Sequence, residues 1–140
     1  EDTPVDAFIA GIGTGGTITG VGEVLKKHYD PVKIIGVEPK TSSVLSGKSP
    51  GPHKIQGIGA GFKPKVLNME VLDKIIPVSD EDAFAFSTRL AKEEGLLVGI
   101  SAGAACCGAF QIAKELGPGK NIVTVFPDNG ERYFSFNQFF

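Results

Sequence analysis

Short apolar runs alternate along this chain with longer segments in which apolar residues recur at helical spacing. The apolar runs are typical of buried strands, which we predict at residues 5–10, 32–38, 74–78, 96–100 and 121–126. Helical spacing predicts helices over residues 18–28, 80–94 and 102–116. Regular alternation of strand and helix is typical of an α/β fold. We therefore predict a single α/β domain over residues 1–140, with a parallel sheet flanked by helices.

Polar residues stand where the predicted helices begin. Ser79 and Asp82 resemble a capping box, with Asp in place of the usual Glu, and Gly95 follows the last turn of that helix. Thr17 and Ser101 are predicted to cap the other two helices, because a side-chain hydroxyl can accept a hydrogen bond from a free backbone N–H group.

The stretch between the second and third predicted strands, residues 39–72, has no clear periodicity. Its central part, Ser46–Gly61, holds five glycines and two prolines. A loop this long inside a compact domain is usually functional or mobile, so we expect one of these two roles. Pro77 in the third strand favours the edge of the sheet or the end of the strand, because proline has no N–H group to donate to a neighbouring strand.

Composition and charge exclude several classes of function. Net charge is −2, which argues against nucleic-acid binding, and no apolar run approaches the roughly 20 residues that cross a membrane. The first residues are acidic and polar, unlike a signal peptide. The only cysteines, Cys106 and Cys107, are adjacent on a predicted helix, so we interpret both as small core residues in a reducing, cytoplasmic setting. Nothing has the spacing of metal ligands, and we predict no metal site.

Residues 11–16, here called the glycine loop, fit the pattern G-x-G-x-x-G between a predicted strand and a predicted helix. Glycine lets backbone N–H groups approach an anion, and a helix N-terminus adds partial positive charge, so the loop predicts phosphate binding. Glu38 lies 22 residues beyond Gly16, as in a dinucleotide-binding fingerprint. A tight turn without a ligand is the structural alternative.

Hydroxyl groups in and near this loop favour a different phosphate. Threonines stand at positions 14, 17 and 19, and a terminal phosphomonoester has more oxygens in need of donors than a pyrophosphate diester. Ser101 stands in a second loop, residues 99–104, before another predicted helix. Both loops are expected at the carboxyl ends of strands, where they can hold opposite ends of one small ring.

Four segments resemble the cysteine synthases (O-acetylserine sulfhydrylases), in the fold-type II family of pyridoxal-phosphate enzymes. They are residues 11–20, 51–61, 99–104 and 127–133. The second segment favours cysteine synthase over cystathionine synthase or threonine dehydratase. The resemblance implies the large domain of a tryptophan-synthase-β-like fold. It also implies that sulfide replaces the acetate of O-acetylserine to give cysteine.

The resemblance assigns roles to individual residues. The residues implied to hold the phosphate of pyridoxal 5'-phosphate are Gly13, Thr14, Gly15, Gly16 and Thr17. Ser101 is implied to bond to the pyridine nitrogen, where a hydroxyl does not force protonation of the ring. Gly57 resembles the loop at the substrate entrance. Relatives are homodimers and can bind the C-terminal tail of serine acetyltransferase at the active site.

Departures from the family pattern limit these expectations. Relatives usually have Ser-Ser where this chain has Ser101-Ala102, and often Pro-Ser where it has Pro127-Asp128. No lysine of this chain matches the family's Schiff-base lysine, which belongs to an N-terminal part before Glu1. We therefore predict no catalytic residue in this chain, and no activity from the chain alone.

Several alternatives remain open at this point. One is a related β-replacement enzyme, such as a cystathionine or β-cyanoalanine synthase. Others are an NAD-type dinucleotide-binding module and a non-catalytic fragment. His53 can touch substrate or a neighbouring subunit, although a structural loop histidine is the favoured interpretation. In the family interpretation, Glu38 only ends a strand.

Overall fold

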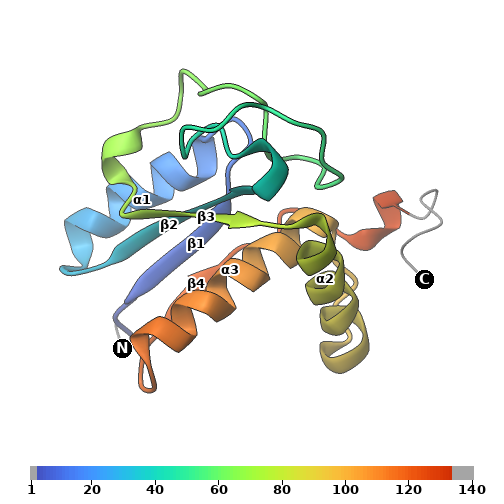
Figure 1. Cartoon of the computed structure of the whole chain (residues 1–140). Coiled ribbons are helices and arrows are strands. Elements are labelled where there is room, and N and C mark those ends of the chain that lie inside the picture. The colour runs from blue at the N-terminus through green and yellow to red at the C-terminus, as the bar shows by residue number, and fades with distance from the viewer. Residues whose placement is uncertain (1–2, 134–140) are drawn as a thin grey trace.

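A four-stranded parallel sheet forms the centre of the molecule (Figure 1). The structure is a computed structural model that describes residues 3–133. The strands are β1 (Ala7–Gly11), β2 (Lys33–Pro39), β3 (Lys74–Val78) and β4 (Ile122–Thr124). They lie in the order β3-β2-β1-β4, and all three pairings are parallel. The predicted α/β class and parallel sheet are confirmed.

Three helices cover the two faces of this sheet (Figure 1). They are α1 (Gly16–His28), α2 (Asp80–Glu94) and α3 (Ile100–Leu116). Helix α1 and the long connection after β2 lie on one face, and α3 lies on the other, with α2 packed against it. Short 3-10 helices occur at Lys40–Ser42, Met69–Val71 and Gly130–Tyr133.

Strand β1 supplies side chains to both hydrophobic cores. Ala7 and Ile9 belong to the core beneath α3, whereas Phe8 and Ala10 belong to the core beneath α1. All four are buried. Because neighbouring side chains of a strand point to opposite faces, a central parallel strand reads as a continuous apolar run. That run made β1 easy to predict.

Small residues let α3 approach its neighbours closely. A Cβ on Gly108 would lie 2.7 Å from Cγ2 of Val37 in the sheet. A Cβ on Gly103 would lie 2.1 Å from the carbonyl oxygen of Ala83 in α2. Because the nearest atom at Gly103 belongs to the backbone, the contact between α2 and α3 requires glycine there.

The predicted strand at 96–100 is wrong. Within this stretch Val98 forms only an isolated antiparallel bridge to Asn129, and Ile100 already begins α3. Leu96 and Leu97 are exposed, while Val98 and Ile100 are buried. The stretch is apolar because the chain here enters the buried N-terminus of α3. Periodicity alone cannot distinguish such a short apolar segment from a strand. The last predicted strand is shorter than residues 121–126, because β4 spans only Ile122–Thr124.

Two of the predicted helix caps are also wrong. Helix α1 begins at Gly16 and its N-cap is Gly15, which has a φ of 87°, so Thr17 lies inside the first turn. Helix α3 has Gly99 as its N-cap, so Ser101 also lies in a first turn. In both places glycine takes the cap position, which frees the hydroxyl of the residue two positions later for another role.

The residues predicted to begin and end α2, and the predicted position of β3, agree with the structure. The Ser79 side chain accepts a hydrogen bond from the Asp82 N–H group, and Gly95 ends α2 with a φ of 70°. Strand β3, which contains Pro77, is an edge strand as predicted.

Of the two cysteines, Cys107 is buried, whereas Cys106 is only partly so. None of the described helices is long and apolar enough to cross a membrane.

We expect Gly103→Ala and Gly20→Ala to change stability in opposite directions. The first places a methyl group against the backbone of α2 and should lower the free energy of unfolding by about 1–3 kcal/mol. A Cβ on Gly20, also in a helix, meets nothing within 4 Å, so that variant should gain about 0.5–1 kcal/mol. Urea unfolding of the two variants measures both effects. Equal stability of the two would contradict the proposed packing of α3.

Candidate functional site

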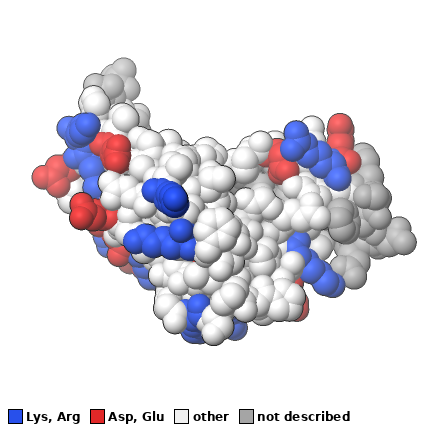
Figure 2. All heavy atoms as spheres, turned by 90° about the horizontal axis from the view of Figure 1, so that it is seen from above, with Lys and Arg blue, Asp and Glu red and all other residues white. Residues whose placement is uncertain are grey.

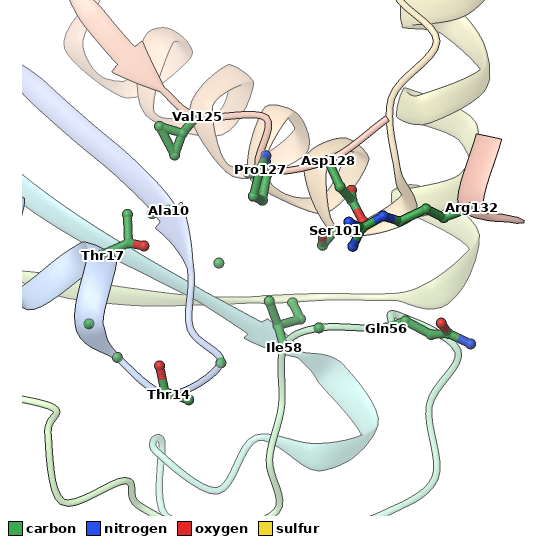
Figure 3. Close-up of a pocket in the computed structure, with 16 residues that line it drawn as sticks. Ala10, Thr14, Thr17, Gln56, Ile58, Ser101, Val125, Pro127, Asp128 and Arg132 are labelled. Atoms are coloured by element: carbon green, nitrogen blue, oxygen red, sulfur yellow. The ribbon is translucent and has the colours of Figure 1, made fainter. Parts of the chain in front are cut away.

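A cavity of about 270 Å³ lies where the glycine loop meets the N-terminal end of α3 (Figure 3). Its other walls come from residues 56–58 and from the chain after β4. The residues that the family resemblance assigns to cofactor or substrate all line it: Gly13, Thr14, Gly15, Gly16, Thr17, Gly57 and Ser101. The structure thus brings together residues from three separate segments, while their individual roles stay predictions.

The topology of the sheet explains this position. From β1 the chain moves outward through β2 to β3, then returns to add β4 on the other side of β1. The carboxyl end of β1 is therefore the point at which the strand order reverses. Crevices at such points are the usual ligand sites of open parallel sheets. Helices α1 and α3, on opposite faces, both begin at this cavity.

Glycine is required in the glycine loop by close contacts as well as by conformation. Gly15 has a φ of +87°, and a Cβ there would lie 2.7 Å from Cβ of Leu67. A Cβ on Gly13 would lie 2.4 Å from the carbonyl oxygen of Gly57. The first turn of α1 contains no acidic side chain, and its N-cap provides no side-chain hydrogen bond. Its free N–H groups therefore face the cavity as donors for an anion.

The three threonines near this loop do not act together. Thr14 and Thr17 line the cavity. The Thr19 hydroxyl instead accepts a hydrogen bond of 3.0 Å from the Asn68 N–H group and lies 3.5 Å from the carbonyl oxygen of Val66. The expectation that all three hydroxyls serve one phosphate is therefore wrong for Thr19, whose side chain holds the 66–68 segment against α1.

Glu38 lies outside the cavity and is occupied by other contacts. Its side chain is 1% exposed. The carboxylate accepts hydrogen bonds from the N–H groups of Leu45 and Ser46, at 2.9 and 3.1 Å, and from the Ser46 hydroxyl at 2.5 Å. It cannot also reach a ribose in the cavity. The dinucleotide hypothesis therefore lacks the acidic residue that would bind the ribose. Glu38 also does more than end a strand, because its carboxylate holds the turn at 45–46.

Asp128 is a cavity residue that the sequence identified only as a departure from the family pattern, without a role of its own. Its Oδ2 accepts a hydrogen bond of 2.5 Å from the Tyr133 hydroxyl, whereas its Oδ1 is buried without a hydrogen-bond partner. That Oδ1 lies 2.1 Å from the position of a Cβ on Gly99, the N-cap of α3. The N-terminal partial charge of α3 therefore stabilises the carboxylate. Asp128 and Ser101 line the same end of the cavity (Figure 3).

Gln56 and Arg132 also line the cavity. The sequence assigned neither of them a binding role, because their segments were recognised only as parts of longer motifs. Elsewhere on this face, Lys, Arg, Asp and Glu gather toward the two ends, and the hollowed surface between them is largely uncharged (Figure 2). Among residues 3–133, no group of three or more His, Cys, Asp and Glu side chains could hold a metal ion.

Comparisons with known proteins agree with this geometry. The family described as "Pyridoxal-phosphate dependent enzyme" matches residues 1–128. A cysteine synthase of Staphylococcus aureus (strain N315) is 59% identical over 135 residues, which are 96% of this chain and 44% of that protein. The chain therefore spans less than half the length of the curated relatives it matches.

Solved structures of three enzymes are also similar. O-acetyl serine sulfhydrylase isoform 3 from Entamoeba histolytica has a TM-score of 0.93 and 46% identity, covering 96% of this chain and 41% of that one. O-acetylserine dependent cystathionine beta-synthase from Helicobacter pylori has a TM-score of 0.90 and 42% identity, covering 97% and 44%. O-ureido-L-serine synthase has a TM-score of 0.93 and 39% identity, covering 98% and 43%.

The pair formed by Tyr133 and Asp128 predicts an unusual titration. Burial, and then the hydrogen bond to the Asp128 carboxylate, raise the pKa of Tyr133 to about 12. In Tyr29→Phe, which leaves Tyr133 as the only tyrosine, the absorbance of ionised tyrosine should have its midpoint near that value. Adding Asp128→Asn should lower the pKa but leave it above the ordinary 10.0, because burial is the larger cause.

The same shift has a consequence for stability. Because the folded-state pKa is raised, the neutral Tyr133 stabilises the fold fully below pH 10. This contribution is lost as pH rises from 10 toward 12. A midpoint near 10 in folded Tyr29→Phe would contradict the buried pair.

Proposed function

Because the chain belongs to the pyridoxal-phosphate-dependent enzyme family, we propose that its cavity holds pyridoxal 5'-phosphate for a cysteine synthase reaction. The observation that supports this most is the meeting of the glycine loop and Ser101 in one cavity. The proposed reaction replaces the acetate of O-acetylserine with sulfide, giving L-cysteine and acetate. The 59% identity to a cysteine synthase supports this choice of reaction.

The two ends of the cavity differ in charge, and the difference suggests how the cofactor lies. At the glycine loop, the first turn of α1 offers N–H groups with no acidic neighbour. At the other end, the Asp128 carboxylate already occupies the neighbourhood of the α3 N-terminus. The first end attracts a phosphate dianion, whereas at the second end the Asp128 carboxylate repels it and offsets the attraction of Arg132, which also lines the cavity there. We therefore place the phosphate at Gly13–Thr17 and the ring nitrogen toward Ser101.

The residues around the phosphate position fit such a group. Glycine at positions 13, 15 and 16 leaves the backbone open to the cavity, and a Cβ at 13 or 15 would meet its neighbours within 2.7 Å. The hydroxyls of Thr14 and Thr17 add two side-chain donors. Together with the α1 N–H groups, they can satisfy several oxygens of a phosphomonoester. This donor set is the reason to favour a terminal phosphate.

The ring end combines a neutral hydroxyl with a buried carboxylate. Ser101 is 5% exposed and can donate to, or accept from, a ring nitrogen. Asp128 has one oxygen without a partner, so it favours positive charge near it. When bound, pyridoxal phosphate supplies the electron sink for carbanion chemistry, and the protein supplies orientation and electrostatics. Gly57 and Gln56 form the wall where we place the amino-acid substrate.

The group that bonds covalently to the cofactor is not among the residues around the cavity. Within the described part of the chain, no lysine lines it. We propose that the chain corresponds to the cofactor-holding part of a longer enzyme, whose Schiff-base lysine lies outside these 140 residues. We also propose a cytoplasmic homodimer, and an active site that can accept the C-terminal tail of serine acetyltransferase.

A second nucleophile has specific support. The Helicobacter pylori enzyme that resembles this chain is an O-acetylserine-dependent cystathionine β-synthase. Homocysteine in place of sulfide would use the same phosphate and ring contacts. Its larger size would have to be accommodated at the wall formed by Gln56 and Gly57. Competition between sulfide and homocysteine in the complete enzyme separates the two reactions.

The chain should bind pyridoxal 5'-phosphate more tightly than pyridoxal or NAD. Equilibrium dialysis measures all three. Thr17→Val removes a hydroxyl that lines the cavity and should weaken binding about tenfold, as expected for one hydrogen bond to a charged group of about 1.5 kcal/mol. Thr19→Val is the matched control, because that hydroxyl faces the 66–68 segment, and it should change the affinity less than twofold. Tighter binding of NAD would support the dinucleotide hypothesis instead.

The chain alone should not synthesise cysteine. With cofactor, O-acetylserine and sulfide present, we expect no cysteine above the rate without protein, because no described lysine reaches the cavity. Detection of cysteine with a thiol-selective amino-acid assay provides the measurement. Robust turnover would show that the chain contains a covalent partner for the cofactor after all.

A further inference from the structure

The 51–61 loop rests directly on the glycine loop, backbone against backbone. The Gly59 N–H group donates a hydrogen bond of 3.0 Å to the carbonyl of Ile12. Two residues earlier in the same loop, the Gly57 carbonyl oxygen lies 2.4 Å from the position of a Cβ on Gly13. With no side chain between them, the position of each loop determines the position of the other.

The tip of the 51–61 loop needs an external restraint. Gly57 and Gly59 have φ values of 88° and 68°, in the left-handed region that glycine adopts easily. A Cβ on Gly57 would meet nothing within 4 Å, so no neighbour packs against the side-chain position of this residue. Fixing the backbone of each residue costs conformational entropy. Contacts made by neighbouring residues must offset that cost.

His53 supplies such a contact. Its Nε2 lies 3.0 Å from the Gly59 carbonyl oxygen, and since a carbonyl only accepts, Nε2 carries the proton and donates. Gly59 is also confined sterically, because a Cβ there would lie 2.5 Å from Pro39 and 2.8 Å from the His53 ring. Both backbone groups of Gly59 are thus engaged, the N–H by the glycine loop and the carbonyl by His53.

The His53 backbone is itself held on both sides. The Thr41 hydroxyl donates a hydrogen bond of 2.7 Å to the carbonyl of Pro52. The Lys54 N–H group donates one of 2.9 Å to the Asp80 carboxylate at the start of α2. Ile55, two residues after the histidine, is 0% exposed. The ring therefore projects from a fixed segment toward a glycine-rich tip.

The other ring nitrogen points to the same conclusion. Nδ1 of His53 is buried and has no hydrogen-bond partner. A buried acceptor without a partner destabilises the fold. The histidine therefore does not serve a polar network that uses both nitrogens. Its one polar contact among the described residues is the one with Gly59.

We propose that His53 is a positioning residue for the cavity. Its Nε2–H group holds the Gly59 carbonyl, Gly59 holds the Ile12 carbonyl, and the Gly57 carbonyl is thereby seated against Gly13. His53 does not line the cavity and acts only through this chain of contacts. The effect on cofactor affinity rests on the proposed function, whereas the effect on loop geometry does not.

Two substitutions of His53 separate the donor from the ring. In His53→Gln the side-chain amide nitrogen is as many bonds from Cβ as Nε2 of histidine is, so a donor to the Gly59 carbonyl is kept. In His53→Asn the amide nitrogen is one bond closer to Cβ and cannot reach that carbonyl. His28, the other histidine, contacts the Val24 carbonyl on the exposed side of α1, and His28→Gln is the matched control.

The measurements are hydrogen exchange of the Gly59 amide and dialysis with pyridoxal 5'-phosphate. We expect His53→Asn to lose about fivefold or more both in protection of that amide and in affinity, as one hydrogen bond of about 1 kcal/mol or more predicts. His53→Gln and His28→Gln should stay within about twofold of the unaltered chain. Rescue by Gln distinguishes the donor from general packing.

Other results would overturn the proposal. If His53→Asn matches the unaltered chain in exchange, or if His53→Gln is as impaired as His53→Asn, the Nε2 donor does not position the loop. Faster exchange with unchanged affinity overturns the link to the cavity. If the unaltered chain does not bind the cofactor, the proposed function fails, and the exchange data still decide whether His53 holds the loop.

Discussion

The contact between the backbones of Gly13 and Gly57 is the constraint on which the site depends. The Gly57 carbonyl oxygen occupies space that any side chain at position 13 would fill, with 2.4 Å between that oxygen and a Cβ. The contact lets two loops more than 40 residues apart in sequence form adjoining walls of one cavity. A flexible side chain in between would let each loop move separately. Here a shift of either loop displaces the other, and with it the wall of the cavity that the other loop forms.

Charge provides the second level of organisation. Parallel strands deliver two helix N-termini to the carboxyl end of β1, and both ends attract anions. The two ends become unequal because Asp128 lies beside Gly99 at the start of α3, held there by Tyr133. The glycine loop is left as the end that can accept an external phosphate. A symmetric pair of helix ends would not define the direction of an asymmetric cofactor.

Local signals in the sequence were sufficient for most of the fold and insufficient at its junctions. Strand β1 follows from an apolar run, and helix α2 follows from the capping box at its start and from Gly95 at its end. The stretch at 96–100 was mistaken for a strand because burial of Val98 and Ile100 comes from tertiary packing around the start of α3. The cavity-lining glycines could be predicted from the motif. Asp128 could not, since its importance arises from a carboxylate oxygen brought to Gly99 by the fold.

Glu38 shows why a motif does not define a ligand. The spacing G-x-G-x-x-G followed by an acidic residue fits a dinucleotide site, and the loop itself has the geometry to bind a phosphate. The fold instead turns the Glu38 side chain inward, where two N–H groups and a hydroxyl satisfy it. A buried carboxylate with this many donors is costly to withdraw from them, so it cannot serve a ribose. The glycine loop is therefore left without a ribose acceptor, and it lies across a small cavity from the Ser101 hydroxyl and the Asp128 carboxylate, which fits the proposal of a short phosphorylated ring.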